Sequence, residues 1–253
     1  MQRILILGGT TEARELAGRL AGEPGRDVTV SLAGRVRDIV PHPVPVRVGG
    51  FGGVEGLAAH LRAERIDVLV DSTHPFADQI ARNAVAASAK ARVPLVVLSR
   101  PPWTAAPGDR WQVVDGIAGA VAALGPVRRR VFLALGRQEL DTFAGDTRHF
   151  YLVRSIDPVA ERSLADAVYV EARGPFREAD ERALMAAHGI DTLVARNSGG
   201  AAGYGKIAAA RALGIAVILI RPPPRSAAHV VETVDAAVDA VLHARASTAE
   251  RGV

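Results

Sequence analysis

The chain has 253 residues, 49% of them hydrophobic, which suffices for one large or two small domains with a substantial core. The absence of Cys excludes disulfides and thiol catalysis, and a formal net charge of +4 is too mild to indicate a nucleic-acid partner. Apolar runs such as "IAVILI" are too short to span a bilayer, and no signal peptide with a cleavage site is recognisable. We therefore expect a cytoplasmic protein with no membrane partner.

Short apolar segments that favour strands alternate with Ala-, Leu- and Arg-rich helical segments along the whole chain. This alternation is typical of parallel sheets that helices cover on both faces. Ten strands are many for one open sheet and fit two sheets of five. The predicted strands are residues 3–7, 28–32, 44–48, 67–71, 94–98, 131–135, 150–153, 168–172, 191–195 and 216–220.

The chain also repeats itself at about half its length. The segment that begins at Ile66 and the segment that begins at Ile190 both contain a strand, a polar loop, a helix, a strand and Arg-Pro-Pro. We predict an α/β protein of two Rossmann-like domains with parallel sheets, residues 1–125 and 126–253, with a ligand cleft between them. The alternative is that any two α/β units resemble each other this closely.

The segment "ILILGGTTEARELA" predicts a strand, a glycine turn and a helix whose N-terminus can bind phosphate. Gly8 and Ala13 fit the first and last positions of the dinucleotide-binding pattern G-x-G-x-x-G/A, while Thr10 occupies the middle one. The alternative is an ordinary turn capped by a threonine. The cofactor residues predicted here are Gly8, Gly9, Thr10, Thr11 and Glu12.

The second strand predicts which nicotinamide cofactor binds. An NAD site has a carboxylate about 20 residues after the glycine turn, but here Ser31, Gly34 and Arg35 stand at the end of the strand. A guanidinium beside a hydroxyl suits a 2′-phosphate, which favours NADPH. The alternative for Arg35 is a solvated surface side chain.

Two further loops follow predicted strands at the same edge of the sheet. The loop "GGFGG" adds Gly50 to the cofactor set, and the loop "DSTHPFA" adds Thr73 and His74. His74 can donate to the nicotinamide, contact substrate, or only hold its own loop. We assign no catalytic residue: Asp71, His74, Tyr204 and solvent all remain candidates for supplying a proton.

Most predicted strands of the second half run into an arginine. Because carboxyl ends of parallel strands share one edge, these arginines predict a cationic rim that attracts a polyanion, with pairing to nearby acids as the alternative. The arginines are Arg137, Arg154, Arg173, Arg196 and Arg221.

The stretch "RNSGGAAGYGKIAAAR" has the glycine and lysine spacing of a P-loop. Ile207 stands where a P-loop needs the Ser or Thr that holds Mg²⁺, so we do not expect nucleotide hydrolysis or a metal site. A glycine loop before a helix still predicts an anion site. Its residues are Ser198, Gly199, Gly200 and Lys206, and Lys206 is notable because the chain has only one other lysine, Lys90.

The segments "GGTTEAR", "SLAGR", "DSTHPFA" and "GYGKIAAARALGIAVILIRPP" resemble, in order along nearly the whole chain, the precorrin-6A reductase family of cobalamin biosynthesis. The resemblance implies two Rossmann-like domains and NADPH-dependent reduction of a double bond in a corrin-precursor macrocycle. It implies a polycarboxylate tetrapyrrole substrate, whose carboxylates we expect to pair with Arg14, Lys206 and the rim arginines.

Some members of that family act on a cobalt-containing intermediate, and the sequence does not choose between the two substrates. Two other classes of function remain open. One is a non-catalytic NADPH-binding regulator, and the other is a tetrapyrrole-processing lyase or synthase of similar two-domain shape.

Overall fold

The computed structural model describes residues 1–253 except 35–40, 156–162, 173, 175, 226–228 and 245–253. The chain forms two compact units, which we call the first unit (Met1–Pro101 and Pro223–Val253) and the second unit (Pro102–Pro222). The predicted α/β fold with two parallel sheets is confirmed. The predicted boundary at residues 125 and 126 is wrong, because the chain enters the second unit after Pro101 and returns to the first at Pro223.

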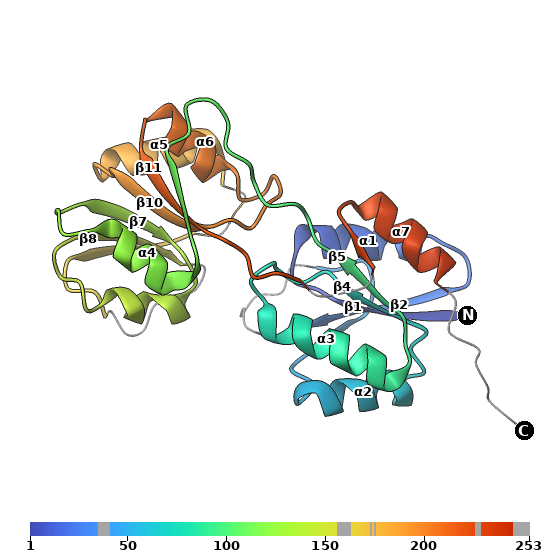
Figure 1. Ribbon diagram of the computed structural model, residues 1–253. Helices are drawn as coiled ribbons and strands as arrows, with labels where there is room; N and C mark the ends of the chain where they lie inside the picture. Colours follow the sequence, from blue (N-terminus) through green and yellow to red (C-terminus); the bar gives the residue numbers. More distant parts are fainter. Residues whose placement is uncertain (35–40, 156–162, 173, 175, 226–228, 245–253) are drawn as a thin grey trace, which may run out of the picture. The chain divides into compact units, whose positions relative to one another are not determined.

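The first unit contains a six-stranded sheet in the order β12-β5-β4-β1-β2-β3 (Figure 1). All its neighbouring strands are parallel, as the near-continuous apolar strands predict. The strands are β1 (Gln2–Leu7), β2 (Arg26–Leu32), β3 (Val46–Val48), β4 (Val68–Asp71), β5 (Leu95–Leu98) and β12 (Val230–Val231).

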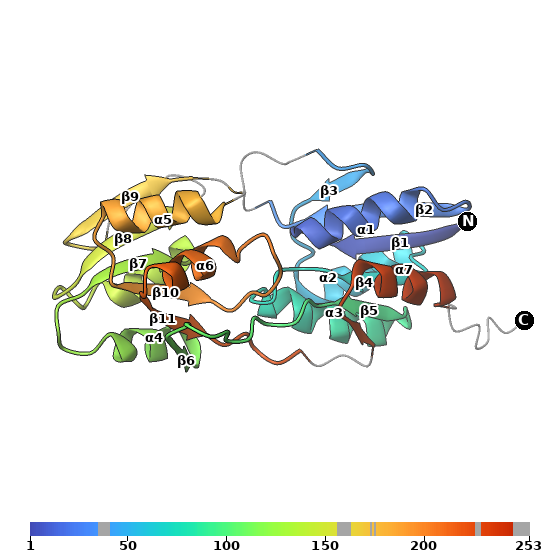
Figure 2. The same ribbon diagram turned by 90° about the horizontal axis from the view of Figure 1, so that it is seen from above.

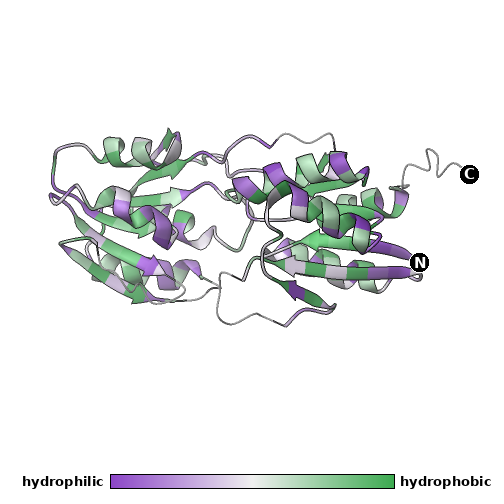
Figure 3. Cartoon of the chain, turned by 90° about the horizontal axis from the view of Figure 1, so that it is seen from below, coloured by the Kyte–Doolittle hydropathy of each residue, from purple (hydrophilic) through white to green (hydrophobic). Residues whose placement is uncertain are grey.

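Side chains of β1 alternate between the two faces of this sheet. Ile4 and Ile6 pack in the core beneath α1 and α7, whereas Leu5 and Leu7 pack with α2 and α3 on the opposite face. Because both faces are covered, the central strands are buried and almost entirely apolar (Figure 3). The helices are α1 (Thr11–Ala21), α2 (Gly53–Ala63), α3 (Asp78–Ala91) and α7 (Val234–His243).

The second unit repeats this arrangement with a sheet in the order β6-β11-β10-β7-β8-β9. Helices α5 and α6 cover one face over a core that includes Phe132, Met185 and Leu219 (Figure 2). Its elements are β6 (Trp111–Val114), α4 (Gly116–Leu124), β7 (Arg130–Ala134), the 3₁₀ helix η1 (Arg137–Phe143), β8 (Phe150–Ser155), β9 (Ala167–Glu171), α5 (Glu178–Ala187), β10 (Thr192–Arg196), α6 (Gly205–Ala212) and β11 (Ala216–Ile220).

In each sheet, five strands are consecutive in the chain, β1 to β5 in the first and β7 to β11 in the second. The sixth strand, β12 or β6, is an edge strand. Strand β6 and helix α4 precede the five strands β7 to β11, whereas β12 and α7 reach the first sheet after the chain has completed the second. The Arg-Pro-Pro sequences that end the two repeats lie where the chain leaves one unit for the other. Proline fits these positions because it favours extended chain and cannot continue a helix.

Among the helices that the structure describes, none combines the length and apolar character needed to cross a membrane.

Candidate functional site

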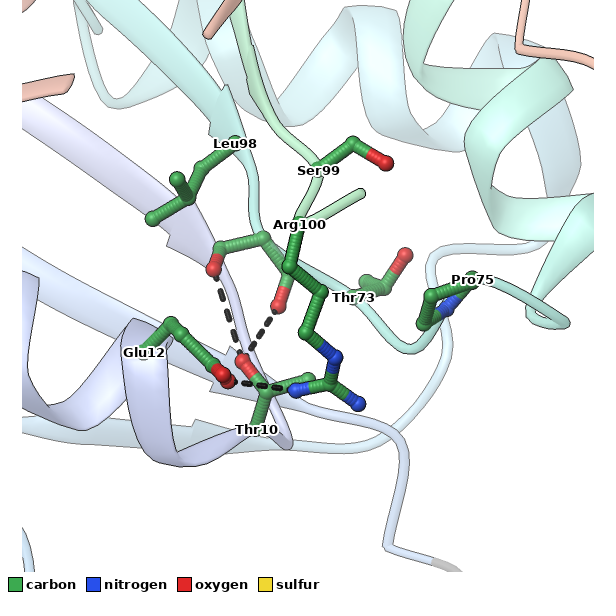
Figure 4. A pocket seen from close by; sticks show the side chains of 8 residues that line it. Thr10, Glu12, Thr73, Pro75, Leu98, Ser99 and Arg100 are labelled. Atoms are coloured by element: carbon green, nitrogen blue, oxygen red, sulfur yellow. Dashed lines mark hydrogen bonds and ion pairs between the residues drawn. The ribbon is translucent and has the colours of Figure 1, made fainter. Parts of the chain in front are cut away.

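The carboxyl edge of the first sheet carries a pocket at its topological switch point. Strand β1 is flanked by β2 on one side and β4 on the other, and ligands of open α/β sheets bind where the strand order reverses in this way. The pocket lies between the loops that follow β1, β4 and β5 (Figure 4). It is lined by Thr10, Glu12, Ser72, Thr73, Pro75, Leu98, Ser99 and Arg100.

The glycine turn after β1 leaves its backbone open to a ligand. Gly8 donates its N–H to Ser31 O at 2.9 Å, and a Cβ at Gly8 would lie 2.8 Å from a methyl group of Val30. Gly9 has φ +117°, and a Cβ there would have no neighbour within 4 Å in the described structure. Gly8 is therefore required for packing, while Gly9 provides backbone that another group can approach.

Thr10 is the N-cap of α1 and joins the glycine turn to the loop after β4. Its Oγ1 accepts the N–H of Ala13 at 3.1 Å and donates to Ser72 O at 2.9 Å. Since this hydroxyl proton already has an acceptor, the local role of Thr10 is to cap the helix and hold the loop. Thr11 follows as the first, exposed residue of α1.

Glu12 and Arg100 form an ion pair beside the pocket. The Arg100 Nη1 lies 2.6 Å from Glu12 Oε2, and the two side chains are only 16% and 25% exposed (Figure 4). We predicted that Glu12 accepts a hydrogen bond from a ribose. In the structure its carboxylate contacts the arginine that follows β5, which the sequence analysis did not identify.

The predicted 2′-phosphate residues lie after β2. Ser31 is buried at the end of this strand, Gly34 has φ +71°, and Arg35 lies outside the described residues. On the neighbouring loop, a Cβ at Gly50 would meet no other described residue within 4 Å, its chain neighbours aside. The predicted residues that are described therefore line the ends of neighbouring strands β2 and β3.

Arg47 is a further cation at this position, and sequence reasoning missed it. Its guanidinium donates to Gly49 O at 2.6 Å and Gly50 O at 2.9 Å, contacts Ser31 Oγ at 3.4 Å, and stacks on Phe51 at 3.9 Å. No carboxylate within the described ranges pairs with it. The register of β2 and β3 places Arg47 opposite Ser31, and the sequence alone does not give that register.

Strand β4 ends at Asp71, which is 1% exposed and binds the loop that follows. Its Oδ1 accepts from Thr73 N at 3.0 Å and Thr73 Oγ1 at 2.6 Å, and its Oδ2 accepts from Arg225 at 2.8 Å. A carboxylate that accepts three hydrogen bonds is poorly suited to donate a proton. In the same loop, His74 Nδ1 accepts the Phe76 N–H at 3.3 Å, so a neutral His74 carries its proton on Nε2.

The glycine loop of the second unit joins β10 to α6. Gly199 and Gly200 have φ of +64° and +70°, which favours glycine, and Ser198 beside them is buried. Lys206, in the first turn of α6, donates to Gly203 O at 2.7 Å and lies 4.9 Å from the ring of Trp103. These contacts hold the ammonium close to the loop in which we predicted an anion site.

Trp103 fastens this loop and was not identified from the sequence. Its N–H and carbonyl form reciprocal hydrogen bonds with the Asn197 amide, at 2.7 and 2.9 Å. Its indole Nε1 donates to Gly200 O at 2.8 Å. Trp103 is the first residue after the Arg-Pro-Pro at the end of the first repeat, but spacing alone could not show where the indole lies.

The prediction of a cationic rim is wrong for three of its arginines, because each forms an ion pair with an acid. Arg154 is buried against Glu181 and stacks on Phe176 at 3.7 Å. Arg196 lies 2.5 Å from Glu139, and Arg221 lies 3.3 Å from Asp115. Acid partners from η1, α5 and the α4 N-cap therefore neutralise much of the charge that the strand ends carry.

The two other members of that rim give no support to it. Arg173 lies outside the described residues, and Arg137 begins η1. Arg14 is exposed on α1, and its charge adds to burial in lowering the pKa of His42. Arg14 is thus accessible on the same helix whose N-terminus follows the glycine turn.

Comparisons with known proteins agree with this architecture over almost the whole chain. The family model described as "Precorrin-6x reductase CbiJ/CobK" matches residues 3–242. The Precorrin-6A reductase of Sinorhizobium sp is 52% identical over 95% of this chain and 93% of its own. That of Rhodococcus erythropolis is 49% identical over 95% and 96%, respectively.

A solved structure titled "CobK precorrin-6A reductase" is 44% identical to this chain. It superimposes with a TM-score of 0.92, with 100% of both chains covered. The extent of the family match and the identity of these relatives leave one assignment: the chain belongs to the precorrin-6x reductase CbiJ/CobK family.

Proposed function

We propose that this protein, a precorrin-6A reductase of cobalamin biosynthesis, uses NADPH to reduce a double bond of the metal-free macrocycle. The observation that carries the cofactor assignment is the pocket at the β1–β4 switch point, beside the open backbone of Gly9. Hydride from C4 of the dihydronicotinamide would go to one carbon of the double bond, and a proton to the other atom. NADPH would leave as NADP⁺, and the macrocycle as its dihydro product.

The first unit supplies the proposed cofactor site. The backbone of Gly8 and Gly9, the N-terminus of α1 and the exposed Thr11 would hold the diphosphate, because amide N–H groups at a helix N-terminus attract anions. Thr73 and His74, after β4, would contact the nicotinamide half. The remaining residues of the proposed cofactor site are Thr10, Glu12, Ser31, Gly34, Arg35 and Gly50.

Discrimination for NADPH over NADH would come from the ends of β2 and β3. Arg47, half-buried and with no carboxylate partner in the described structure, lies against Ser31. A 2′-phosphate would supply the counter-charge that this guanidinium lacks, since arginine binds phosphate with several donors at once. Arg35 would add a second guanidinium.

The second unit supplies most of the proposed substrate site. The positive-φ turn at Gly199 and Gly200, the Ser198 hydroxyl and Lys206 would hold carboxylates of the macrocycle. Arg14 of the first unit would pair with another carboxylate. Hydride transfer depends chiefly on the relative position of donor and acceptor, so these contacts would contribute by orienting the macrocycle.

We infer the metal-free substrate because both relatives compared above carry the name precorrin-6A reductase, without cobalt. We also propose the cytoplasm as the compartment, because the proposed reaction needs a supply of NADPH. Parallel assays with the metal-free and the cobalt-containing macrocycle would test the first of these inferences.

The test of the function follows the absorbance of reduced nicotinamide in the presence of purified protein, with and without the macrocycle. We expect NADPH to be oxidised only when the macrocycle is present, in equal molar amount. An NADPH-binding regulator would bind the cofactor without oxidising it. A lyase or synthase would convert the macrocycle without using NADPH.

A further inference from the structure

Arg225 holds the loop after β4 in place with both terminal nitrogens of its guanidinium group. Its Nη1 donates to Asp71 Oδ2 at 2.8 Å, and its Nη2 donates to Thr73 O at 3.1 Å and His74 O at 2.8 Å. The Asp71 side chain is 2% exposed and that of Arg225 10%. One arginine therefore connects Asp71, the last residue of the strand, to Thr73 and His74 in the loop.

The position of Arg225 in the chain makes this contact unusual. The residue lies 151 to 154 positions after its partners, on the segment that returns from the second unit toward β12. The loop it holds includes Thr73, a wall of the pocket, and His74, the side chain we expect near the nicotinamide. The returning segment thus braces the pocket from outside the loop.

We propose that Arg225 is a positioning residue for hydride transfer, a role that rests on the proposed function. By binding two successive carbonyl groups, Arg225 fixes the backbone of Thr73 and His74, and by binding Asp71 it fixes the carboxylate that orders Thr73. The planar fork of arginine reaches these acceptors together, which the single ammonium group of lysine cannot reproduce. Arg225 itself has no role in moving the proton or the hydride.

The competing role is that of a latch, in which Arg225 only attaches the returning segment through a buried ion pair. The two roles differ in what Arg225→Lys restores. A latch needs only a positive charge opposite Asp71, so lysine would restore both stability and activity. A positioning residue needs the fork, so lysine would recover stability while leaving the loop loose.

The experiment compares Arg225→Ala and Arg225→Lys with Arg19→Ala. Arg19 is the control, because it also forms an ion pair between the first run of the first unit and the part of the chain after Pro223, at Asp235 of α7. This pair is solvent-exposed, and neither of its residues belongs to the loop. Three quantities are measured in each protein: thermal stability, kcat with saturating NADPH and macrocycle, and amide hydrogen exchange of residues 72–77 without ligand.

We expect kcat to fall about tenfold to a hundredfold in both Arg225 variants, because small displacements of reacting groups have effects of this size. Exchange in residues 72–77 should be faster by about tenfold or more in both, and unchanged in Arg19→Ala. Wild-type kcat and wild-type exchange in a folded Arg225→Lys would overturn the proposal and leave the latch.

Hydrogen exchange separates this proposal from the function on which it rests. If the wild-type protein oxidised no NADPH with the macrocycle, the proposed function would fail. Exchange that was slow in wild type and fast in Arg225→Lys would still show that Arg225 orders the loop. If Arg225→Ala failed to fold, the lysine variant alone would decide between the two roles.

Discussion

Arg47 and Ser31 face each other across the β2–β3 pair, with 3.4 Å between the guanidinium Nη1 and the serine Oγ. This relationship places a cation without a described carboxylate partner at the edge where we expect the adenosine half of the cofactor. It also makes the choice between NADPH and NADH testable at a single side chain.

Replacement of Arg47 by Ala should weaken NADPH binding about tenfold to a hundredfold and leave NADH binding nearly unchanged. A charge-assisted hydrogen bond contributes roughly 1.5–3 kcal/mol, which corresponds to this range of Kd. Calorimetric titration with each cofactor measures the two Kd values, and Arg65→Ala, at an exposed position, is the control. Arg35→Ala should shift affinity in the same direction. Equal losses for NADPH and NADH in Arg47→Ala would remove the 2′-phosphate from this position.

Gly9→Val should abolish cofactor binding while the first unit remains folded. The new methyl groups would occupy the open space above the backbone at Gly9, where we place the diphosphate. The control is Gly25→Val, since Gly25 also has positive φ and no neighbour within 4 Å among the residues that the structure describes, but lies in the turn before β2. A folded Gly9→Val that bound NADPH with wild-type affinity would mean that the diphosphate lies elsewhere.

Lys206→Ala should raise KM for the macrocycle, or lower kcat/KM, by about tenfold or more, because a charged hydrogen bond is worth roughly 1.5–3 kcal/mol. NADPH affinity should change little. The only other lysine of the chain, Lys90, is exposed on α3 and paired with Glu55, so Lys90→Ala is the matched control. Lost NADPH affinity with intact macrocycle kinetics would instead assign the loop to a nucleotide phosphate.

Trp103→Phe should keep the aromatic face beside Lys206 but remove the hydrogen bond from the indole to Gly200 O. Because this bond holds the glycine loop, we expect KM for the macrocycle to rise while the affinity for NADPH stays constant. Steady-state kinetics with each substrate varied in turn measures the two effects. A variant with unchanged KM for the macrocycle would show that the indole hydrogen bond has no part in shaping the loop.

Asp146 predicts a pH-dependent contribution to stability in the second unit. The hydrogen bond from Arg148 lowers the pKa of this carboxyl from 3.8 to about 2. The native state therefore favours the ionised form, so the contribution is present above pH 3.8 and is lost as the pH falls through 2. Asp146→Asn should be less stable than wild type at neutral pH, with the difference shrinking on acidification. A difference that stayed constant down to the acid limit would contradict the assigned cause.

Local sequence pattern was sufficient for most of the fold. The apolar strands, the intervening helices and the glycine turn at Gly8 and Gly9 are encoded by neighbouring residues, so they could be predicted. The sixth strand of each sheet, β12 in the first unit and β6 in the second, could not be predicted. Strand β12 is only Val230–Val231, too short to give a periodic signal, and its place beside β5 depends on where the chain returns.

The site divides in the same way. The two glycine loops could be predicted because their turns depend on adjacent residues, as the positive φ of Gly9, Gly199 and Gly200 shows, while the binding of phosphate and carboxylate there stays a prediction. Arg47, Trp103 and Arg225 could not be predicted. Strand register places Arg47, and contacts between residues far apart in the chain place Trp103 and Arg225. The paired rim arginines were misjudged for the same reason, as acids such as Glu181 approach them only in the folded unit.

The most direct measurement of the central claim is the fate of the hydride. The enzyme is given precorrin-6A with NADPH deuterated at C4, in separate reactions for the two faces of the nicotinamide, and the product is analysed by mass spectrometry and NMR. We predict that one of the two cofactors delivers a single deuterium to a macrocycle carbon, while the other leaves its deuterium on NADP⁺. A reduced macrocycle without deuterium from either cofactor would contradict direct hydride transfer from NADPH.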